Sequence, residues 1–364
     1  MSHRTHTSSH ARLVADVVSG GQAAARYDVQ IRASWQRCLA DYALQPGRPR
    51  QPAIVRGAEL RQRRERSAAV YAIAQVEMRT LTQLFNAPVG VMLTDADGVI
   101  LSYCGDPSFA EMAATAGFRD GAIWSESEQG TNGMGTCLAV GAPVLIEGPA
   151  HFLSRNAGLT CCAAPIADGG GRLVGTLNMS GRPQLSAGPT QALVQLAVQN
   201  IENRALLDRH RAHHLLRFHP HREFISTAGE GLLAFDDQGV VLAANRSALG
   251  WLGLSRHDEV CGTSVGSLFG CTLEQLMALS RTSVHARPLS RRGSGLLCFG
   301  ILQTPADVCL APADPLADAE RNTLRAELER CRWNVSVAAE RLAISRRTLY
   351  RKLERHGLQR YRRD

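Results

Sequence analysis

The sequence predicts a multidomain α+β protein, with two units built on antiparallel sheets and helices, followed by an all-α C-terminal unit. Its length of 364 residues is enough for two or three separate cores. Two segments, GVMLTDADGVILS (90–102) and GLLAFDDQGVVLA (231–243), align without a gap. The stretch NVSVAAERLAISRRTLYRKLERHGL (334–358) has the spacing of a helix-turn-helix. These three observations carry the prediction.

Each aligned segment is typical of a β-hairpin. An apolar strand is followed by an Asp-x-x-Gly turn and a second apolar strand. Each hairpin is expected to begin a separate antiparallel sheet with helices packed against it.

The C-terminal stretch contains the features that two short, closely crossing helices need. Asn334 and Ser345 are expected to cap the two helices, because their side chains can accept hydrogen bonds from the first turn. Leu349 and Leu353 lie four residues apart and face inward. The faces left outward carry Arg346, Arg347, Tyr350, Arg351 and Arg355. A basic run alone would indicate only a solvated helix, but the caps, turn and apolar pattern favour a DNA-binding unit.

The overall charge fits a polyanionic partner. The net charge is +8 and the isoelectric point is about 9.2, with Lys352 as the single lysine. No continuous apolar stretch approaches the ~20 residues of a membrane span, and no secretory signal is evident. The ten cysteines are scattered without a C-x-x-C pair. We therefore expect a cytoplasmic protein with reduced thiols and no membrane partner.

The C-terminal segment resembles the Fis-type domain of the nucleoid protein Fis and of bacterial enhancer-binding regulators. The resemblance implies that Arg346 reads a guanine, and that Ser345, Tyr350 and Arg351 contact base edges and backbone. Tyr350 departs from the basic residue that Fis carries at this position. The predicted DNA-binding residues are Asn334, Ser336, Ser345, Arg346, Arg347, Thr348, Tyr350, Arg351 and Lys352.

The region upstream resembles the GAF domain of regulators of acetoin and glycerol catabolism. The residues that carry this resemblance are Trp124, Ser125, Glu126, Gly130, Thr131, Asn132, Gly133, Gly135 and Thr136. The segment IRASWQRCLADYALQP (31–46) is similar to the N-terminal helix of the same regulators. The second hairpin begins a unit that resembles a PAS domain.

These resemblances and the periodicity predict the following organisation. Residues 1–79 are a disordered and helical region, in which about the first 24 are disordered, and 80–183 form the GAF unit. Residues 190–217 are a connecting helix, 221–303 a PAS-like unit, 304–317 a linker and 318–364 the helix-turn-helix unit, with a further helix over 319–332. The spacing of the apolar residues from 194 to 205 fits either a coiled-coil seam or a packed core helix.

The GAF resemblance implies a pocket for a small effector, lined by Trp124, Asn132, Phe152 and Cys161. Each aromatic residue alone fits a core position equally well. Cys161, Cys162 and His151 are compatible with metal or redox sensing, although successive strand residues point to opposite faces and a buried free cysteine is the commoner case. Five histidines between 210 and 221 are interleaved with arginines, which favours a solvated face over a metal site. No metal and no cofactor are predicted.

The mechanism is constrained by a missing motif. The regulators that this chain resembles carry a central AAA+ ATPase domain, which requires the phosphate-binding loop G-x-x-x-x-G-K-[ST]. With Lys352 as the single lysine, the chain contains no such loop. It also contains no H-E-x-x-H motif and no kinase signature, so no enzymatic activity is predicted.

The predicted function is a ligand-responsive, sequence-specific DNA-binding transcription regulator without ATPase activity. The expected partners are double-stranded DNA, a small effector, a second copy in a homodimer, and RNA polymerase or an ATPase-containing relative. The alternatives are a co-regulator or antagonist of such a relative, an architectural DNA protein, and a redox or metal sensor.

Overall fold

The protein is described here by a computed structural model with two compact units, residues 1–304 and 305–364. The residues it describes are 2–48, 50–85, 87–183, 185, 187–278, 287–290, 297–305, 324, 327–328, 330–331, 333–342 and 344–355. Most of the predicted linker 304–317 and most of the predicted helix 319–332 lie outside these residues. Each unit is described by itself below.

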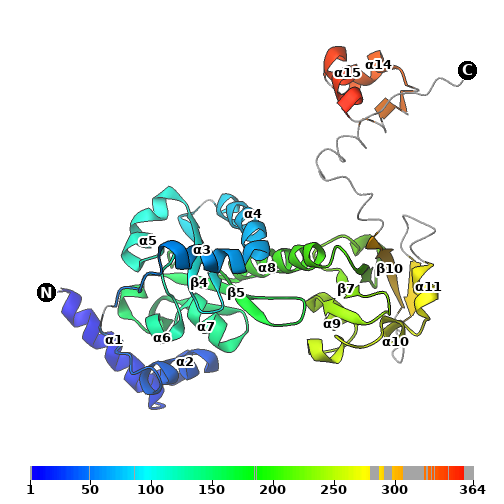
Figure 1. Cartoon of the computed structure of the whole chain (residues 1–364). Helices are drawn as coiled ribbons and strands as arrows, with labels where there is room; N and C mark the ends of the chain where they lie inside the picture. The colour runs from blue at the N-terminus through cyan, green and yellow to red at the C-terminus, as the bar shows by residue number, and fades with distance from the viewer. Residues whose placement is uncertain are drawn as a thin grey trace, which may run out of the picture. The chain divides into compact units, whose positions relative to one another are not determined.

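The first unit contains two five-stranded sheets, and every neighbouring pair of strands is antiparallel. The first sheet has the order β2-β1-β5-β4-β3. Figure 1 labels its strands β4 and β5. Its strands are β1 (Val89–Asp95), β2 (Ile100–Gly105), β3 (Val144–Glu147), β4 (Thr160–Ala167) and β5 (Leu173–Gly181). The mixed α/β character with antiparallel sheets is confirmed.

Helices cover both faces of the first sheet. The helices α4 (Ala68–Leu84) and α8 (Ala187–Arg209) pack on one face, where Val91 and Leu93 point. Met92, between them, points to the other face, toward α5 (Ala110–Ala116) and α7 (Gly133–Val140). This alternation follows from the two-residue period of a strand. The remaining helices of this part are α1 (Ser2–Val18), α2 (Val29–Ala40), α3 (Gly57–Arg66) and α6 (Glu126–Gln129).

The second sheet has the order β8-β7-β6-β10-β9. Its strands are β6 (His214–His219), β7 (Gly231–Phe235), β8 (Val241–Ala244), β9 (Arg287–Ser290) and β10 (Leu297–Gln303). The short helices α9 (Arg246–Trp251), α10 (Val265–Phe269) and α11 (Leu273–Met277) pack with it. Both aligned hairpins of the sequence form, as β1–β2 and β7–β8.

The prediction of a continuous helix over 190–217 is wrong, because α8 ends at Arg209 and residues 214–219 form the central strand of the second sheet. The second sheet therefore begins with β6 rather than with the hairpin. Leu215 packs toward α8 on one face, and Leu216 and Phe218 pack into the core on the other. A strand buried on both faces forms an apolar run that helical spacing also fits.

The predicted disorder of the first 24 residues is also wrong for the described part of that segment. Residues 2–18 form α1, in which Val14 and Val17 are buried against Trp35 and Phe152. Val14 and Val17 are three residues apart and so lie on the same side of the helix, and His10 also approaches the carbonyl of Phe152 at 3.0 Å.

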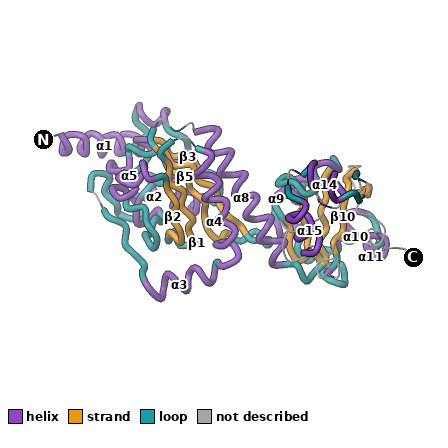
Figure 2. Tube along the Cα trace, turned by 90° about the horizontal axis from the view of Figure 1, so that it is seen from above, coloured by secondary structure: helices purple, strands orange, loops and turns teal. Residues whose placement is uncertain are grey.

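The helix α8 belongs to both halves of the first unit. Val194, Val198 and Ile201 are buried in the core of the first sheet, whereas Leu206 packs with the second sheet. The apolar spacing is therefore that of a core helix within this unit. Figure 2 shows α8 running from the first sheet toward the second.

We predict that Asn245→Ala destabilises the second sheet by roughly 1–3 kcal/mol. The Asn245 amide accepts hydrogen bonds from the N–H groups of Leu232 and Ala248 at 2.9 and 2.8 Å, and donates to Asn203 of α8. Chemical denaturation followed by circular dichroism measures the change, with Gln238→Ala in the exposed turn as the control. Equal effects of the two substitutions would contradict the assigned role.

Candidate functional site

The C-terminal unit holds two capped helices that pack on each other. The helix α14 (Val335–Arg341) begins after Asn334, whose side chain accepts hydrogen bonds from the N–H groups of Ser336 and Val337 at 3.1 and 3.3 Å. The helix α15 (Arg346–Arg355) begins after Ser345, whose hydroxyl accepts from the N–H of Thr348 at 3.1 Å. Both predicted caps are confirmed, because polar side chains satisfy the free donors of each first turn.

Apolar side chains join these two helices. Ala338 and Ala339 are buried where α14 meets α15, and Leu349 and Leu353 are buried on the inner side of α15. Small alanine side chains let two helix backbones approach closely. The predicted inner face is therefore confirmed, and Arg346 and Tyr350, which lie away from it, are exposed.

The predicted DNA-binding residues divide into two groups. Asn334, Ser345 and Thr348 take part in the helix caps. Arg346 is exposed in the first turn of α15, and Tyr350, one turn further on, is 60% exposed. Ser336 is exposed and Lys352 is half-buried, whereas the side chains of Arg347 and Arg351 lie outside the described part. Contact of any of them with DNA stays a prediction.

In the first unit, the segment 124–136 folds around Asn132. The amide oxygen of Asn132 accepts from the N–H of Gly135 at 2.9 Å, and its amide nitrogen donates to the carbonyls of Trp124 and Gly130 at 3.2 and 2.8 Å. Gly130 has a φ of 63°, and a Cβ there would meet the ring of Phe152. Asn132 is thus fully engaged in shaping the loop.

The helix α2 binds this segment through a buried polar cluster. The hydroxyl of Ser34 donates to Glu126 at 2.6 Å and lies 2.6 Å from the hydroxyl of Thr131. Arg37 holds the same carboxylate with two hydrogen bonds, at 2.7 and 3.1 Å. The neighbouring Trp35 donates to the carbonyl of Ala150 at 3.0 Å. The resemblance named these α2 residues, but nothing in the sequence spacing indicated that they meet Glu126.

The four predicted effector-binding residues are all buried. Trp124 and Phe152 have no exposed surface; Trp124 lies against Phe118 with ring centroids 4.5 Å apart, and Phe152 packs with the α1 and α2 residues. Asn132 and Cys161 are at most 1% exposed. Effector contact by these residues stays a prediction.

Cys161 belongs to a chain of buried polar side chains. Its sulfur lies 3.2 Å from Nε2 of His151 and 3.1 Å from the hydroxyl of Ser180, which in turn accepts from the amide of Asn178 at 2.9 Å. Burial raises the pKa of Cys161 to about 11 and lowers the pKa of His151 to about 4. At neutral pH the pair is a thiol beside a neutral imidazole, not a reactive thiolate.

Cys162 points to the opposite face of the sheet, as the strand period predicts, and packs with α8. The histidines between 210 and 221 are not on one helix, because His214 and His219 lie in β6. Among the described residues no group of three or more histidine, cysteine or acidic side chains is arranged to hold a metal ion.

Sequence reasoning overlooked one enzyme-like pattern, GTSVG at 262–266, which matches the G-x-S-x-G motif of hydrolases. A nucleophile elbow needs a strained turn between a strand and a helix. Ser264 instead has an ordinary extended conformation, with φ −76° and ψ 128°, at an exposed position before the short α10. The pattern here lacks the geometry of a catalytic serine.

Two family profiles match this chain. The profile of the MimR N-terminal domain matches residues 12–203, which is more than half of the chain. The chain belongs to the MimR N-terminal domain family. A second profile, that of bacterial regulatory proteins of the Fis family, matches residues 315–356 and covers both α14 and α15.

Several proteins similar to this chain are named as regulators. The acetoin catabolism regulatory protein of Cupriavidus necator is 32% identical over 312 residues, covering 80% of this chain and 46% of that protein. The propane 2-monooxygenase operon activator MimR of Mycolicibacterium smegmatis is 31% identical over 137 residues, covering 37% and 24%. The chain spans less than half the length of the curated relatives it matches.

Among solved structures, the Escherichia coli DhaR(N)–DhaL complex aligns with a TM-score of 0.49 at 18% identity, covering 76% of this chain and 99% of the matched chain. Within the described residues, no helix has the length and apolar character needed to cross a bilayer.

We predict that His151 makes stability fall in mild acid. Its pKa is about 4 in the folded protein against 6.5 in the unfolded chain. Below pH 6.5 the imidazole is therefore protonated in the unfolded chain but stays neutral in the folded protein. The free energy of unfolding falls by about 3 kcal/mol by pH 4.

Denaturation between pH 7.5 and pH 4 tests this. His151→Gln should lose less stability over this range than the wild type, whereas His221→Gln, at an exposed position, should follow the wild type. Identical pH slopes for the wild type and His151→Gln would contradict the prediction.

Proposed function

We propose that this protein is a sequence-specific DNA-binding transcription regulator that responds to a small metabolite and does not hydrolyse ATP. The observation that carries the proposal is the arrangement of α15, which buries Leu349 and Leu353 and exposes Arg346 and Tyr350. A capped, amphipathic helix with cations in its first turn fits the major groove. The Fis-family match and the names of the relatives support the same function.

In this proposal Arg346 reads a guanine and Tyr350 adds an apolar contact. A guanidinium in the first turn can donate two hydrogen bonds to O6 and N7 of guanine. Tyr350, 60% exposed, offers a ring that suits a thymine methyl group. Ser336 in the first turn of α14 is exposed, and its hydroxyl suits a hydrogen bond to a phosphate.

We predict that Arg346→Ala weakens binding to the operator by roughly 1–3 kcal/mol and removes the base preference at one position of each half-site. Binding of the full chain to a library of single-base operator variants, read by fluorescence anisotropy, measures both effects. Arg330→Ala is the matched control, since Arg330 is exposed and pairs with Glu327 at 3.0 Å. If affinity falls while the base preference is unchanged, Arg346 contacts phosphate only.

The first sheet is proposed to be a GAF-like effector domain and the second a PAS-like domain. The buried polar atoms of the first domain that form no hydrogen bond with the described residues include the amide oxygen of Asn178 and the indole nitrogen of Trp124. Such buried atoms favour a polar partner that is not part of the chain. Asn178 is beside the start of α7, because a Cβ at Gly133 would lie 2.2 Å from its amide oxygen.

A small metabolite with a hydroxyl group suits this position, since the hydroxyl can donate to the amide oxygen of Asn178. Relatives named for acetoin and glycerol metabolism support that class of effector. DNA binding is measured with and without acetoin, glycerol and acetone, for the wild type, Asn178→Leu and the control Asn200→Ala on α8. Asn178→Leu should lose the response and keep its DNA affinity, whereas an unchanged response would contradict the assigned site.

The chain is proposed to act without remodelling polymerase itself. The phosphate-binding loop of an ATPase needs a lysine, and Lys352 in α15 is the single lysine. It is therefore proposed to recruit polymerase, to block a promoter, or to compete with an ATPase-containing relative. Binding as a homodimer is part of the proposal, because one helix-turn-helix reads only a few base pairs.

We predict that the purified protein neither binds ATP in a magnesium-dependent way nor hydrolyses it. Transcription in vitro with polymerase holoenzyme, with ATP replaced as an energy source by a non-hydrolysable analogue, should show the same effect of this protein. Magnesium-dependent ATP turnover by the pure chain would contradict this part of the proposal. Loss of a relative's activation at shared sites would favour competition over recruitment.

A further inference from the structure

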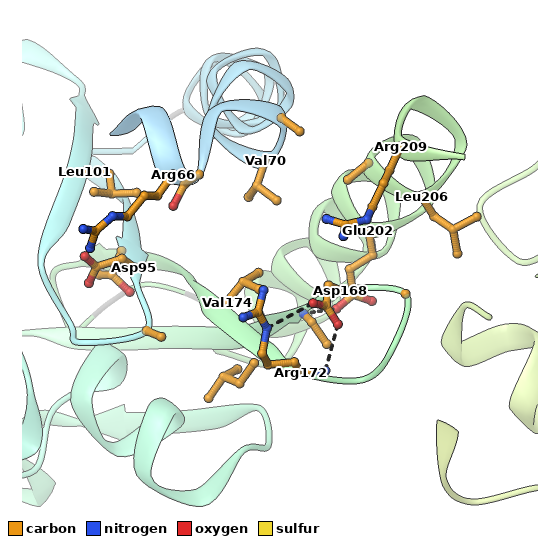
Figure 3. A pocket seen from close by; sticks show the side chains of 18 of the residues that line it. Arg66, Val70, Asp95, Leu101, Asp168, Arg172, Val174, Glu202, Leu206 and Arg209 are labelled. Atoms are coloured by element: carbon orange, nitrogen blue, oxygen red, sulfur yellow. Dashed lines mark hydrogen bonds and ion pairs between the residues drawn. The ribbon is translucent and has the colours of Figure 1, made fainter. Parts of the chain in front are cut away.

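A cavity of about 620 Å³ lies on the α4 and α8 side of the first sheet (Figure 3). Its walls come from the end of α3, the start of α4, the turns β1–β2 and β4–β5, and the last turns of α8. Cys161 and its polar cluster belong to the other side of the sheet. The cavity is therefore separate from the effector position proposed above.

Part of the cavity surface is apolar. Val70 of α4, Leu101 of β2, Val174 of β5 and Leu206 of α8 line it. Its volume lies within the range of small-molecule sites, roughly 300–1,000 Å³. A ligand with an aliphatic portion would find an apolar surface here.

The buried carboxylates of the wall already have partners. Asp95 accepts from Arg63 at 2.7 Å and from two backbone N–H groups at 3.0 Å. Glu202 accepts from the N–H of Ala167 at 2.7 Å and from Arg246 at 2.8 Å. Asp168 is bonded to Arg172 and to the backbone of its own turn. Of the other two acidic side chains, Asp97 pairs with Arg63 and Asp208 is exposed.

The guanidinium groups, by contrast, retain free donors. Within the described part of the chain, the side chains of Arg66 and Arg209 form no ion pair and no hydrogen bond, and Arg172 uses only its Nε. Figure 3 shows Arg172 and Arg209 directed into the space between α4 and α8, with Arg66 on the opposite wall. His210 adds no charge at neutral pH, because burial and the adjacent His213 and Arg209 lower its pKa.

We propose that this cavity is a second ligand site, which binds a small aliphatic carboxylate. The carboxylate is held between Arg172 and Arg209, whose free N–H groups match the two oxygens of an acid, and Arg66 offers further donors on the opposite wall. The aliphatic portion lies against Val70 and Val174. Nothing in this proposal depends on DNA binding or on the effector position near Asn178.

Arg172 lies beside a turn that connects this site to the second sheet. Arg172 follows the turn between β4 and β5, whose Gly169 carbonyl accepts from the N–H of Ala244 in β8 at 2.9 Å. A Cβ at Gly169 would lie 2.7 Å from the Cβ of Ala243, and one at Gly171 would lie 2.4 Å from His257. The turn thus touches the cavity on one side and the second sheet on the other, so a ligand that draws Arg172 inward moves a segment that contacts both.

Three probes of equal chain length test the proposal: hexanoate, 1-hexanol and hexylammonium. Each is titrated into the full-length protein by isothermal calorimetry at low salt, without DNA. Hexanoate should bind at least tenfold more tightly than either other probe, because only its carboxylate can accept from the guanidinium groups. Raising the salt concentration should weaken hexanoate binding and leave 1-hexanol unaffected.

Arg209→Ala should weaken hexanoate binding about tenfold or more, because a charge-assisted hydrogen bond is lost. Arg204→Ala is the matched control, since Arg204 is exposed on the same helix and does not line the cavity. Arg209→Lys should bind with intermediate affinity, and unchanged circular dichroism of all three variants shows that they fold.

Three results would overturn the proposal. Hexanoate that does not bind at millimolar concentration would remove the site. Equal affinities for hexanoate and hexylammonium would remove the preference for an anion. Hexanoate binding that is unchanged in the double variant Arg66→Ala/Arg209→Ala would place the ligand elsewhere.

Discussion

The organisation of the first unit depends on one helix that contributes to two cores. Val194, Val198 and Ile201 of α8 complete the core of the first sheet, and Leu206, five residues after Ile201, packs with the second. Between these apolar groups, Glu202 pairs with Arg246 and Asn203 accepts a hydrogen bond from Asn245. Close-packed cores transmit displacements rather than absorb them. A shift of α8 therefore requires side chains on both sheets to move with it.

The polar contacts of α8 determine how the second sheet is attached. Asn245 caps α9 and bonds to α8 with the same amide group, so the start of α9 is fixed relative to α8. Glu202 bonds to the backbone of β4 and to Arg246 at the first position of α9. Glu202 and Asn203 lie between the residues of α8 that pack in the first core and Leu206, which packs in the second. Buried hydrogen bonds at this point specify one orientation of the second sheet on α8, which apolar contacts alone do not.

The features that were predictable from the sequence are those with local causes. The two hairpins follow from an Asp-x-x-Gly turn between apolar strands, and the caps Asn334 and Ser345 follow from the first-turn donors of a helix. The strand β6 was not predictable in the same way. Its residues HLLRFH satisfy both helical and strand periods, and only the neighbouring strands β7 and β10 decide between them.

The candidate sites were also predictable only where their residues lie close together in the sequence. The positions of Trp124, Asn132, Phe152 and Cys161 were selected through a resemblance, but the partners of Cys161 come from separate segments at 151 and 180, which no local pattern connects. The cavity lined by Arg172 and Arg209 was not anticipated at all. Its walls come from two turns and three helices that lie far apart in the sequence.

Arginine, used almost to the exclusion of lysine, suits the interactions that hold these segments together. Three nearly buried carboxylates, Glu126, Glu202 and Glu230, each meet a guanidinium: Arg37, Arg246 and Arg217. A guanidinium can bond both oxygens of one acid, as Arg37 does with Glu126, or reach two acceptors at once, as Arg246 does with Glu202 and the Pro165 carbonyl. A lysine ammonium lacks the planar pair of donors that bonds both oxygens of one acid. The preference is therefore structural in the first unit, and the net positive charge by itself says little about where DNA binds.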